Sequence, residues 1–464
     1  MFDKSVYRKR REELKRNMSS GLLIFLGNDE SPMNYPGNPY PFRQDSTFLY
    51  YFGLQDPGLE AIIDLDSGEE MLFGYDYTVD DIVWMGPQPT LQERAERVGV
   101  ARGLPDEEMG DVVWEAIRKG RKVHVLPTYR PEHEIKLVKL LGVTPDYQSL
   151  YVSEEFIRAV VAQRSVKGPE EIDEIEQALK ITREVHLFAM HQTRPGRYER
   201  EIAGAIEGIA RARGGRLSFP IIFSIHGETL HNHHHHNLMK EGDMVVNDCG
   251  GETAEGYAGD ITRTLPVSGR FTTRQREIYE IVLRSQLAAI DAIRPGIKYR
   301  DVHLLTARVI ADGLKELGLM KGDMAEAVTQ GAHALFFPHG LGHMMGLDVH
   351  DMENLGEDYV GYDAETKRSE QFGLAYLRLA KALQPGYVLT VEPGIYFIPE
   401  LIDQWKSAKK FADFINYDKV EEYRNFGGIR IEDDVLVTET GHRVLGEPIP
   451  KTVEEVEREM EKGR

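Results

Sequence analysis

The last two-thirds of the chain combine hydrophobic patterns typical of helices with patterns typical of strands. Apolar residues recur at the three- and four-residue spacing of amphipathic helices in four stretches, 170–191, 197–213, 273–293 and 299–317. Shorter apolar runs predict strands at 244–248, 258–267, 387–392 and 429–437. Runs of helices mixed with paired strands favour an α+β domain over a regular parallel α/β fold.

The first 150 residues have a different pattern. Apolar runs predict strands at 59–64 and 122–126, and charged amphipathic stretches predict helices at 92–100 and 105–120, so a small α/β domain is expected. Four prolines within residues 30–42 exclude a regular element there and predict a loop. Pro169 with two following glutamates is typical of a helix start after a boundary at 164–168. We therefore expect an N-terminal domain at 1–160 and a second domain at 165–464.

Composition and charge exclude several classes of protein. With 464 residues, of which 41% are hydrophobic and 28% charged, the chain is long enough to bury a large core. A net charge of −20 disfavours nucleic acid as a partner. The longest apolar run near the start, 22–26, is far shorter than the ~20 residues of a membrane helix, and no signal-peptide stretch is recognised. With a single cysteine as well, we expect a cytoplasmic protein without membrane association.

Two aspartates stand at the ends of neighbouring strand patterns. Asp248 ends the run 244–248 and Asp260 opens the next run, with a glycine-bearing stretch between them. If the two runs pair as a hairpin, both carboxylates can lie side by side on one face. Adjacent buried acids repel each other, and a divalent cation removes that cost. For this pair alone, the favoured alternative is two exposed turn residues.

A second group of candidate residues lies among glycines at 338–351. Its three histidines, His339, His343 and His350, are not expected in a helix because the glycines at 340, 342 and 346 would weaken it. Glycine lets backbone approach a ligand closely, and imidazole is a common metal ligand and proton carrier. The alternative is a flexible loop with incidental histidines.

Two glutamates interrupt apolar strand patterns. Glu392 follows the run 387–391, and Glu432 lies within 429–437. A lone glutamate in such a place is more often a salt-bridge partner or an edge residue than a metal ligand. Four carboxylates with one histidine change that balance, because such a set suits Mn²⁺, Co²⁺, Fe²⁺ or Zn²⁺ and has enough ligands for two ions.

The motifs around these residues resemble a known family. The strings at 248–250, 259–264, 339–343, 391–394 and 428–433 are similar, in the same order, to those of aminopeptidase P and prolidase. These are Xaa-Pro peptidases with the pita-bread fold. Residues 42–53 are similar to the family's N-terminal domain, so the resemblance covers nearly the whole chain. It implies a pita-bread catalytic domain of the α+β class behind an α/β domain of the aminopeptidase P type.

The resemblance also implies a role for each candidate residue. Asp248, Asp260, His343, Glu392 and Glu432 would hold two divalent ions, with Asp260 and Glu432 bridging them. Manganese is the expected metal, with cobalt, iron and zinc as alternatives. Glu392 would also accept the proton of the attacking water and pass it to the leaving proline nitrogen. His350, His339 and His231 would contact substrate, and Arg430 would orient carboxylates or bind the product; for His339 and Arg430 structural support is an equal alternative.

Several functions fit this set of motifs. We favour an Xaa-Pro aminopeptidase, which acts on peptides with proline in the second position, and keep an Xaa-Pro dipeptidase close behind. Extra chain at 352–384 and 399–426 and the strings around Glu392 look closer to prolidases. All five ligands are present, which argues against creatinase and against a non-catalytic binding protein, while the N-terminal domain argues against methionine aminopeptidase. By analogy a homodimer is expected, and the histidines at 233–236 are expected in an exposed loop that binds metal only adventitiously.

Overall fold

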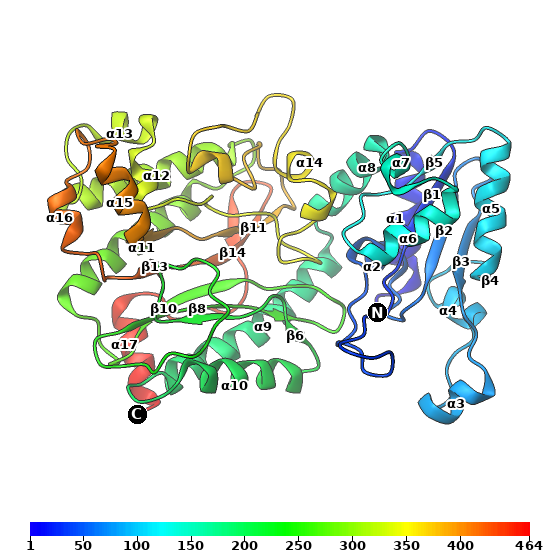
Figure 1. Ribbon diagram of the computed structural model, residues 1–464, viewed down its shortest axis with the longest axis horizontal. Coiled ribbons are helices and arrows are strands. Elements are labelled where there is room, and N and C mark those ends of the chain that lie inside the picture. The colour runs from blue at the N-terminus through cyan, green and yellow to red at the C-terminus, as the bar shows by residue number, and fades with distance from the viewer. The chain divides into compact units, whose positions relative to one another are not determined.

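Two units make up the chain in the computed structural model, which describes all 464 residues (Figure 1). One unit comprises residues 1–164 together with 353–359, and the other comprises 165–352 and 360–464. No helix in either unit has the length and apolar character needed to cross a bilayer.

The first unit is built around a five-stranded sheet of order β4-β3-β2-β1-β5. β1 is antiparallel to β2 and β2 to β3, whereas the outer pairs β3–β4 and β1–β5 are parallel. The strands are β1 (Leu22–Leu26), β2 (Glu60–Asp64), β3 (Glu70–Gly74), β4 (Arg102–Pro105) and β5 (Val123–His124). The helices are α1 (Lys4–Arg16), α2 (Ser46–Phe52), α3 (Val79–Met85), α4 (Leu91–Arg97), α5 (Glu107–Arg118), α6 (Pro131–Leu141), α7 (Pro145–Gln148) and α8 (Glu154–Ser165).

The core of this unit forms where amphipathic helices cover the sheet. α5 buries Met109, Val113 and Ala116, which lie on one face of the helix, against strand residues such as Ile62 and Phe73. The helices predicted at 92–100 and 105–120 are present as α4 and α5, α4 ending three residues earlier and α5 being two residues shorter at each end, and residues 30–42 form a loop as expected. The α/β prediction for the N-terminal part is confirmed.

The second unit combines two helix pairs with short antiparallel sheets. The first pair, α9 (Pro169–Gln192) and α10 (Glu199–Ala212), packs against the strands that follow it, and the second pair, α11 (Thr273–Ala292) and α12 (Tyr299–Glu316), packs against later strands (Figure 1). The earlier strands are β6 (Arg216–Leu217), β7 (Ile222–Ser224), β8 (Met244–Cys249), β9 (Gly251–Glu252) and β10 (Ile261–Pro266). The α+β prediction is confirmed.

The same three residues connect the two helices of each pair, and we call this connection the joint. Arg194-Pro195-Gly196 joins α9 to α10, and Arg294-Pro295-Gly296 joins α11 to α12. The glycines have φ of 87° and 84°, a left-handed conformation that favours glycine. The same three-residue motif therefore connects the two helices of each pair.

The remaining elements complete the second unit. They are α13 (Met324–Gln330), η1 (Ala332–Leu335), η3 (Leu374–Tyr376), β11 (Val388–Val391), β12 (Gly394–Tyr396), α15 (Pro399–Ser407), α16 (Tyr417–Glu421), β13 (Gly428–Arg430), β14 (Asp433–Val437), β15 (His442–Val444) and α17 (Val453–Lys462). Residues 353–361 carry η2 (Glu353–Leu355), which belongs to the first unit, and α14 (Glu357–Gly361), which spans the division between the units.

One strand prediction is wrong. Residues 429–437 are not a single strand, because β13 pairs with β12 in one sheet and β14 pairs with β11 and β15 in another. The break falls at Ile431 and Glu432, where the backbone N–H of Glu432 donates instead to the carbonyl of Thr262 on β10 (3.1 Å). A continuous apolar pattern does not reveal this change of hydrogen-bonding partner.

Candidate metal centre

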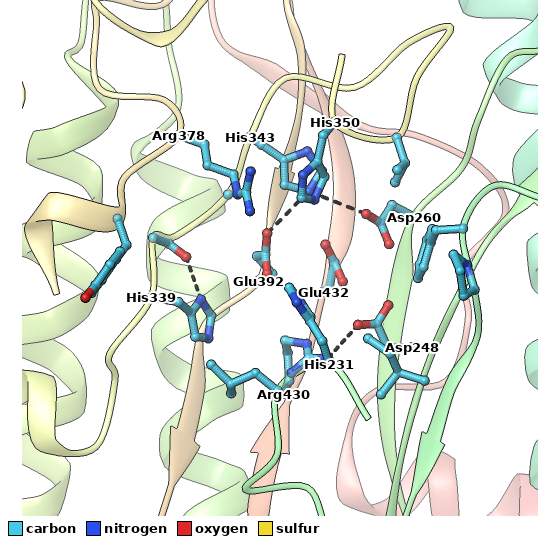
Figure 2. Close-up of a pocket in the computed structure, with 18 of the residues that line it drawn as sticks. His231, Asp248, Asp260, His339, His343, His350, Arg378, Glu392, Arg430 and Glu432 are labelled. Carbon is cyan, nitrogen blue, oxygen red and sulfur yellow. Dashed lines mark hydrogen bonds and ion pairs between the residues drawn. The ribbon is translucent and has the colours of Figure 1, made fainter. Parts of the chain in front are cut away.

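A cavity of about 320 Å³ in the second unit brings together all nine residues singled out in the sequence (Figure 2). They are His231, Asp248, Asp260, His339, His343, His350, Glu392, Arg430 and Glu432. The four carboxylates and His343 converge from four separate segments of the chain. The remaining wall includes apolar side chains such as Phe219, Pro220 and Val349.

A hairpin positions the two aspartates. β8 and β10 pair antiparallel with Asp248 opposite Thr262 and Cys249 opposite Ile261, so the expected pairing is present. Asp260 lies directly before β10, and its backbone N–H donates to Oδ2 of the buried Asp434 (2.9 Å). Neither aspartate is an exposed turn residue, because Asp248 is 7% exposed and Asp260 4% exposed.

Matching breaks in two paired strands position the two glutamates. Glu392 lies between β11 and β12, and Glu432 lies between the partner strands β13 and β14. The backbone N–H of Glu392 donates to the carbonyl of Leu341 (2.9 Å) rather than to the ladder. The Glu432 carboxylate accepts a 2.6 Å hydrogen bond from the Thr262 hydroxyl. The breaks therefore turn both carboxylates toward the cavity.

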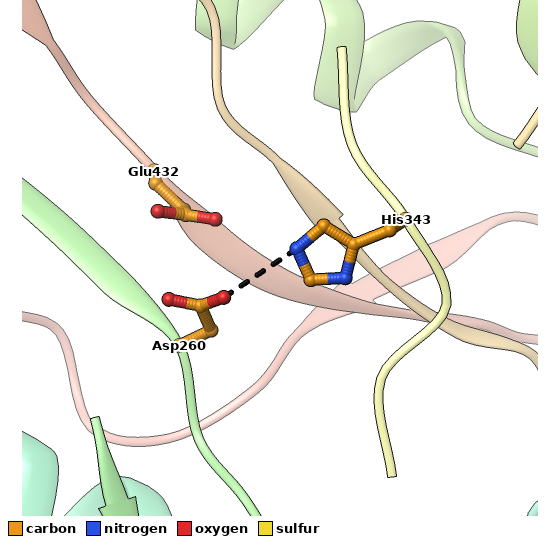
Figure 3. Close-up of side chains that lie close together, drawn as sticks. All are labelled: Asp260, His343 and Glu432. Carbon is orange, nitrogen blue, oxygen red and sulfur yellow. Dashed lines mark ion pairs between the residues drawn. The ribbon is translucent and has the colours of Figure 1, made fainter. Parts of the chain in front are cut away.

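His343 is fixed with one ring nitrogen facing the carboxylates (Figure 3). Its Nδ1 lies 3.0 Å from the carbonyl of Met344, which can only accept, so Nδ1 carries the hydrogen. Nε2 then presents its lone pair 3.5 Å from an oxygen of Asp260 and 3.5 Å from an oxygen of Glu392. The loop reaches this place because Gly342 packs against β11, where a Cβ would lie 2.1 Å from the Thr390 carbonyl.

Arg430 connects Asp248 to His339 through a chain of hydrogen bonds. Its guanidinium donates to Asp248 Oδ2 (2.5 Å) and to the hydroxyl of Tyr396 (3.0 Å). The Tyr396 hydroxyl lies 2.9 Å from Nε2 of His339, whose Nδ1 lies 2.7 Å from the Gly340 carbonyl. Both ring nitrogens of His339 are therefore engaged within the protein, and burial lowers its pKa to about 3.

Three further side chains line the cavity near the carboxylates. His350 packs its ring against His343 with the ring centres 4.0 Å apart. His231 is exposed and comes from the segment after β7. Arg378, which the sequence analysis did not single out, lies near Glu392 and His343 in Figure 2 and adds a second guanidinium to the cavity.

Burial shifts the protonation of the carboxylates toward the neutral form. It raises the pKa of Glu392 to about 7, with His343 opposing and Asp260 reinforcing the shift. Burial and the Asp248 charge raise the pKa of Asp260 well above its usual value, and burial together with Asp260 does the same for Glu432. The Glu392 side chain is 18% exposed, against 6% for Asp260, so it is the more accessible of the two to a substrate.

The residues present fit a divalent cation. Ligand atoms of Asp260, His343 and Glu432 all lie within 4.8 Å of one another. One oxygen each of Asp248 and Asp260 is buried without a hydrogen-bond partner, an expensive state that a bound cation relieves. Carboxylates with one imidazole are the ligand set expected for a hard or borderline divalent ion.

Sequence reasoning missed several residues that support the site. The Thr262 hydroxyl donates to Glu432, and the Thr390 hydroxyl lies 3.2 Å from Glu392 and accepts the backbone N–H of His343 (3.1 Å). Each threonine stands two residues from a candidate carboxylate ligand, Asp260 or Glu392, along an extended segment. Residues two apart share a face, so strand periodicity could have found both threonines. No comparable signal marks Arg378, which lies outside any strand.

Comparison with known proteins agrees with this geometry. Residues 173–439 match the model of metallopeptidase family M24, and residues 7–126 match that of the aminopeptidase P N-terminal domain. The chain is 33% identical to an Escherichia coli Xaa-Pro aminopeptidase and 32% identical to the human Xaa-Pro dipeptidase, covering 96–97% of this chain and 96% and 90% of those proteins. A zinc-substituted E. coli aminopeptidase P solved with product superposes with a TM-score of 0.80 at 30% identity, covering 100% of this chain and 99% of that one.

Fold and site together define a metal-dependent hydrolase that cleaves peptide bonds. The chain belongs to metallopeptidase family M24. The resemblance to aminopeptidase P and prolidase and the pita-bread prediction are confirmed, since an aminopeptidase P matches over the full length.

Proposed function

We propose that this chain is an Xaa-Pro aminopeptidase that removes the N-terminal residue from peptides with proline in the second position. The observation that carries the proposal is the convergence of Asp248, Asp260, His343, Glu392 and Glu432 at one cavity. The similarity to an E. coli Xaa-Pro aminopeptidase over 96% of that protein supports the substrate class.

We propose that these five residues hold two divalent ions, with Asp260 and Glu432 shared between them. A divalent ion supplies Lewis-acid chemistry, which polarises the peptide carbonyl and lowers the pKa of water. The unpartnered oxygens of Asp248 and Asp260 are free to ligate, and His343 directs Nε2 to the same place. Manganese is our proposal for the metal, and metal analysis of protein purified without chelator tests both identity and number.

Glu392 is our candidate for the proton-transfer step. Its carboxylate takes a proton from the attacking water and delivers it to the proline nitrogen as the peptide bond breaks. Burial raises the pKa of Glu392 to about 7 in the metal-free protein, and nearby cations would favour its ionised form, which is the form that accepts the proton. Thr390 lies beside the same carboxylate and limits its movement.

Other residues position the reacting groups. Arg430 holds Asp248 and, through Tyr396, the ring of His339. With both ring nitrogens of His339 engaged, we assign to it a positioning role, and we assign substrate contact to His350 and His231. The apolar wall around Phe219, Pro220 and Val349 suits the ring of the substrate proline.

Arg378 favours a second candidate function, that of an Xaa-Pro dipeptidase. A guanidinium in the cavity can bind the free carboxylate that a dipeptide carries next to the scissile bond. The 32% identity to the human Xaa-Pro dipeptidase supports the same alternative. A longer peptide has an amide at that position and gains no ion pair.

Hydrolysis of matched peptides separates the two candidates. The metal-loaded enzyme is assayed with Ala-Pro, Ala-Pro-Ala and Ala-Ala-Ala. An aminopeptidase cleaves Ala-Pro-Ala with the higher kcat/KM, and Ala-Ala-Ala is cleaved poorly. A clear preference for Ala-Pro that disappears in Arg378→Met would establish the dipeptidase instead. Arg294→Met, a change of an arginine at the α11–α12 joint, serves as the control.

Two further proposals concern the state of the protein in the cell. We propose a homodimer by analogy with the family, and small-angle scattering that gives a monomer mass would refute it. We propose a cytoplasmic location, and recovery in a secreted or periplasmic fraction would refute that.

A further inference from the structure

A loop next to the candidate metal centre carries five of the chain's 16 histidines within residues 231–236. We call residues 225–237 the histidine loop; it follows β7 and precedes β8. His231, His233, His234 and His236 are all exposed, and of these four only His231 and His233 line the cavity. The roles assigned above account for His231 but for none of the histidines at 233–236.

The histidine loop is held at both ends by one buried carboxylate. Glu199 on α10, which is 0% exposed, accepts hydrogen bonds from the backbone N–H of Ile225 (2.8 Å) and of Asn237 (3.2 Å) and from the Asn237 side chain. Inside the loop, Asn232 donates to the Ser224 hydroxyl (3.0 Å) and accepts the His234 N–H (3.0 Å). The loop is therefore ordered before any ligand binds, which reduces the entropy cost of binding.

The histidines of the loop differ in the direction of their rings. The ring of His235 turns inward, with Nδ1 3.2 Å from the carbonyl of Phe223. Its neighbours His234 and His236 lie side by side in solvent with their ring centres 6.0 Å apart and their planes within 19° of parallel. A cation held between two imidazoles by metal–nitrogen bonds of ~2.0–2.1 Å keeps their ring centres about 5–6 Å apart. Small side-chain rotations would therefore bring both rings onto one ion.

We propose that His234 and His236 form an outer metal site that binds one late transition-metal ion such as Zn²⁺, Ni²⁺ or Cu²⁺. Two neutral imidazoles suit these ions and not Mn²⁺ or Mg²⁺, which favour oxygen ligands. The site is distinct from the carboxylate centre because neither His234 nor His236 lines that cavity. Water completes the coordination.

Occupancy of the outer site slows peptide hydrolysis. His233, which lines the cavity, is bonded in sequence to the ligand His234, so an ion bound there stiffens the cavity rim and adds positive charge beside it. The N-terminal ammonium of a peptide approaching the rim is then repelled. This second part of the inference rests on the proposed peptidase function, whereas the metal binding does not.

Zinc calorimetry and inhibition on manganese-loaded protein test the site. The variant is His234→Asn with His236→Asn, and the control is His226→Asn, another exposed histidine of the loop, which pairs with Glu228 (3.0 Å). We expect wild type and control to bind one zinc ion more than the double variant, with micromolar affinity. Half-inhibition of Ala-Pro-Ala hydrolysis by zinc is expected to require at least a tenfold higher concentration in the double variant.

Each outcome decides one part of the inference. Equal zinc stoichiometry in all three proteins overturns the outer site. A lower stoichiometry in the double variant with unchanged zinc inhibition upholds the site and overturns its effect on hydrolysis. If none of the proteins cleaves any Xaa-Pro peptide, the proposed function fails, while the stoichiometry still decides whether the outer site exists.

Discussion

Arg430 offers the sharpest test of how the centre is held together. Its guanidinium donates to Asp248, Tyr396 and Thr262 at 2.5, 3.0 and 3.2 Å, and the side chains of Arg430 and Asp248 are 5% and 10% exposed. Arg430→Met preserves most of the apolar volume but leaves the Asp248 carboxylate buried without its cation. We expect metal-free Arg430→Met to be strongly destabilised.

A second arginine–carboxylate pair with the same separation serves as a control for the size of the stability loss. Arg443 and Glu176 also lie 2.5 Å apart, but Arg443 is 47% exposed, so that Arg443→Met should cost at most about 1 kcal/mol. Breaking the buried Arg430–Asp248 pair should cost about 3–5 kcal/mol. At ~2–4 °C per kcal/mol for a large domain, Arg430→Met should lower Tm by about 6–20 °C.

Differential scanning calorimetry in chelator and in saturating Mn²⁺ measures both effects. Bound cations give Asp248 a new partner, so Mn²⁺ should restore part of the lost Tm in Arg430→Met. The reasoning is refuted if Arg430→Met melts close to wild type in chelator, or if Arg443→Met is destabilised equally.

Three other predictions follow from the charges in the second unit. Glu392→Gln should lower kcat for Ala-Pro-Ala at least ~10²-fold. It should not lower Tm in chelator, because it removes repulsion among buried carboxylates. The control Glu400→Gln, at an exposed position on α15, should leave kcat unchanged. Mn²⁺ at about 1,000 times the Kd of each site should stabilise wild type by about 4 kcal/mol per bound ion, and an Asp260→Asn variant that gains as much would contradict the ligand assignment. Burial lowers the pKa of His333 to about 4, so the unfolded chain binds this proton near pH 6.5 and the folded chain does not. Titration of His333 therefore leaves the free energy of unfolding unchanged above pH 6.5 and lowers it by up to ~1.4 kcal/mol per pH unit below pH 6.5. The free energy of unfolding of His333→Phe should fall less than that of wild type between pH 7 and pH 5, and equal decreases in the two proteins would disprove this.

The sequence identified the candidate ligands that meet at the cavity but did not place the strands that carry them as well. Asp248, Asp260, His343, Glu392 and Glu432 were found because order and spacing of motifs along the chain are local information. The break between β13 and β14 was missed because it depends on the N–H of Glu432 pairing with Thr262, 170 residues away in the chain. The pattern of apolar residues does not determine which distant residue accepts the hydrogen bond of a given backbone N–H.

The supporting residues show a similar limit. Thr262 and Thr390 could have been inferred because each lies two residues from a candidate ligand in the sequence. The repeated Arg-Pro-Gly motif at 194–196 and 294–296 is also visible in the sequence itself. Arg378 could not have been inferred, because it lies outside any helix or strand and only the tertiary structure brings it to the cavity. The hydrogen bonds of Tyr396 to both Arg430 and His339 likewise depend on three-dimensional distances.

The central claim is that these carboxylates and His343 hold two catalytic metal ions. Anomalous diffraction at the manganese edge, from crystals of protein loaded with Mn²⁺, tests it most directly. Two anomalous peaks are expected in the cavity, one ligated by Asp248 and one by His343, with Asp260 and Glu432 touching both. No peak among these residues, or a peak only elsewhere in the chain, would contradict it.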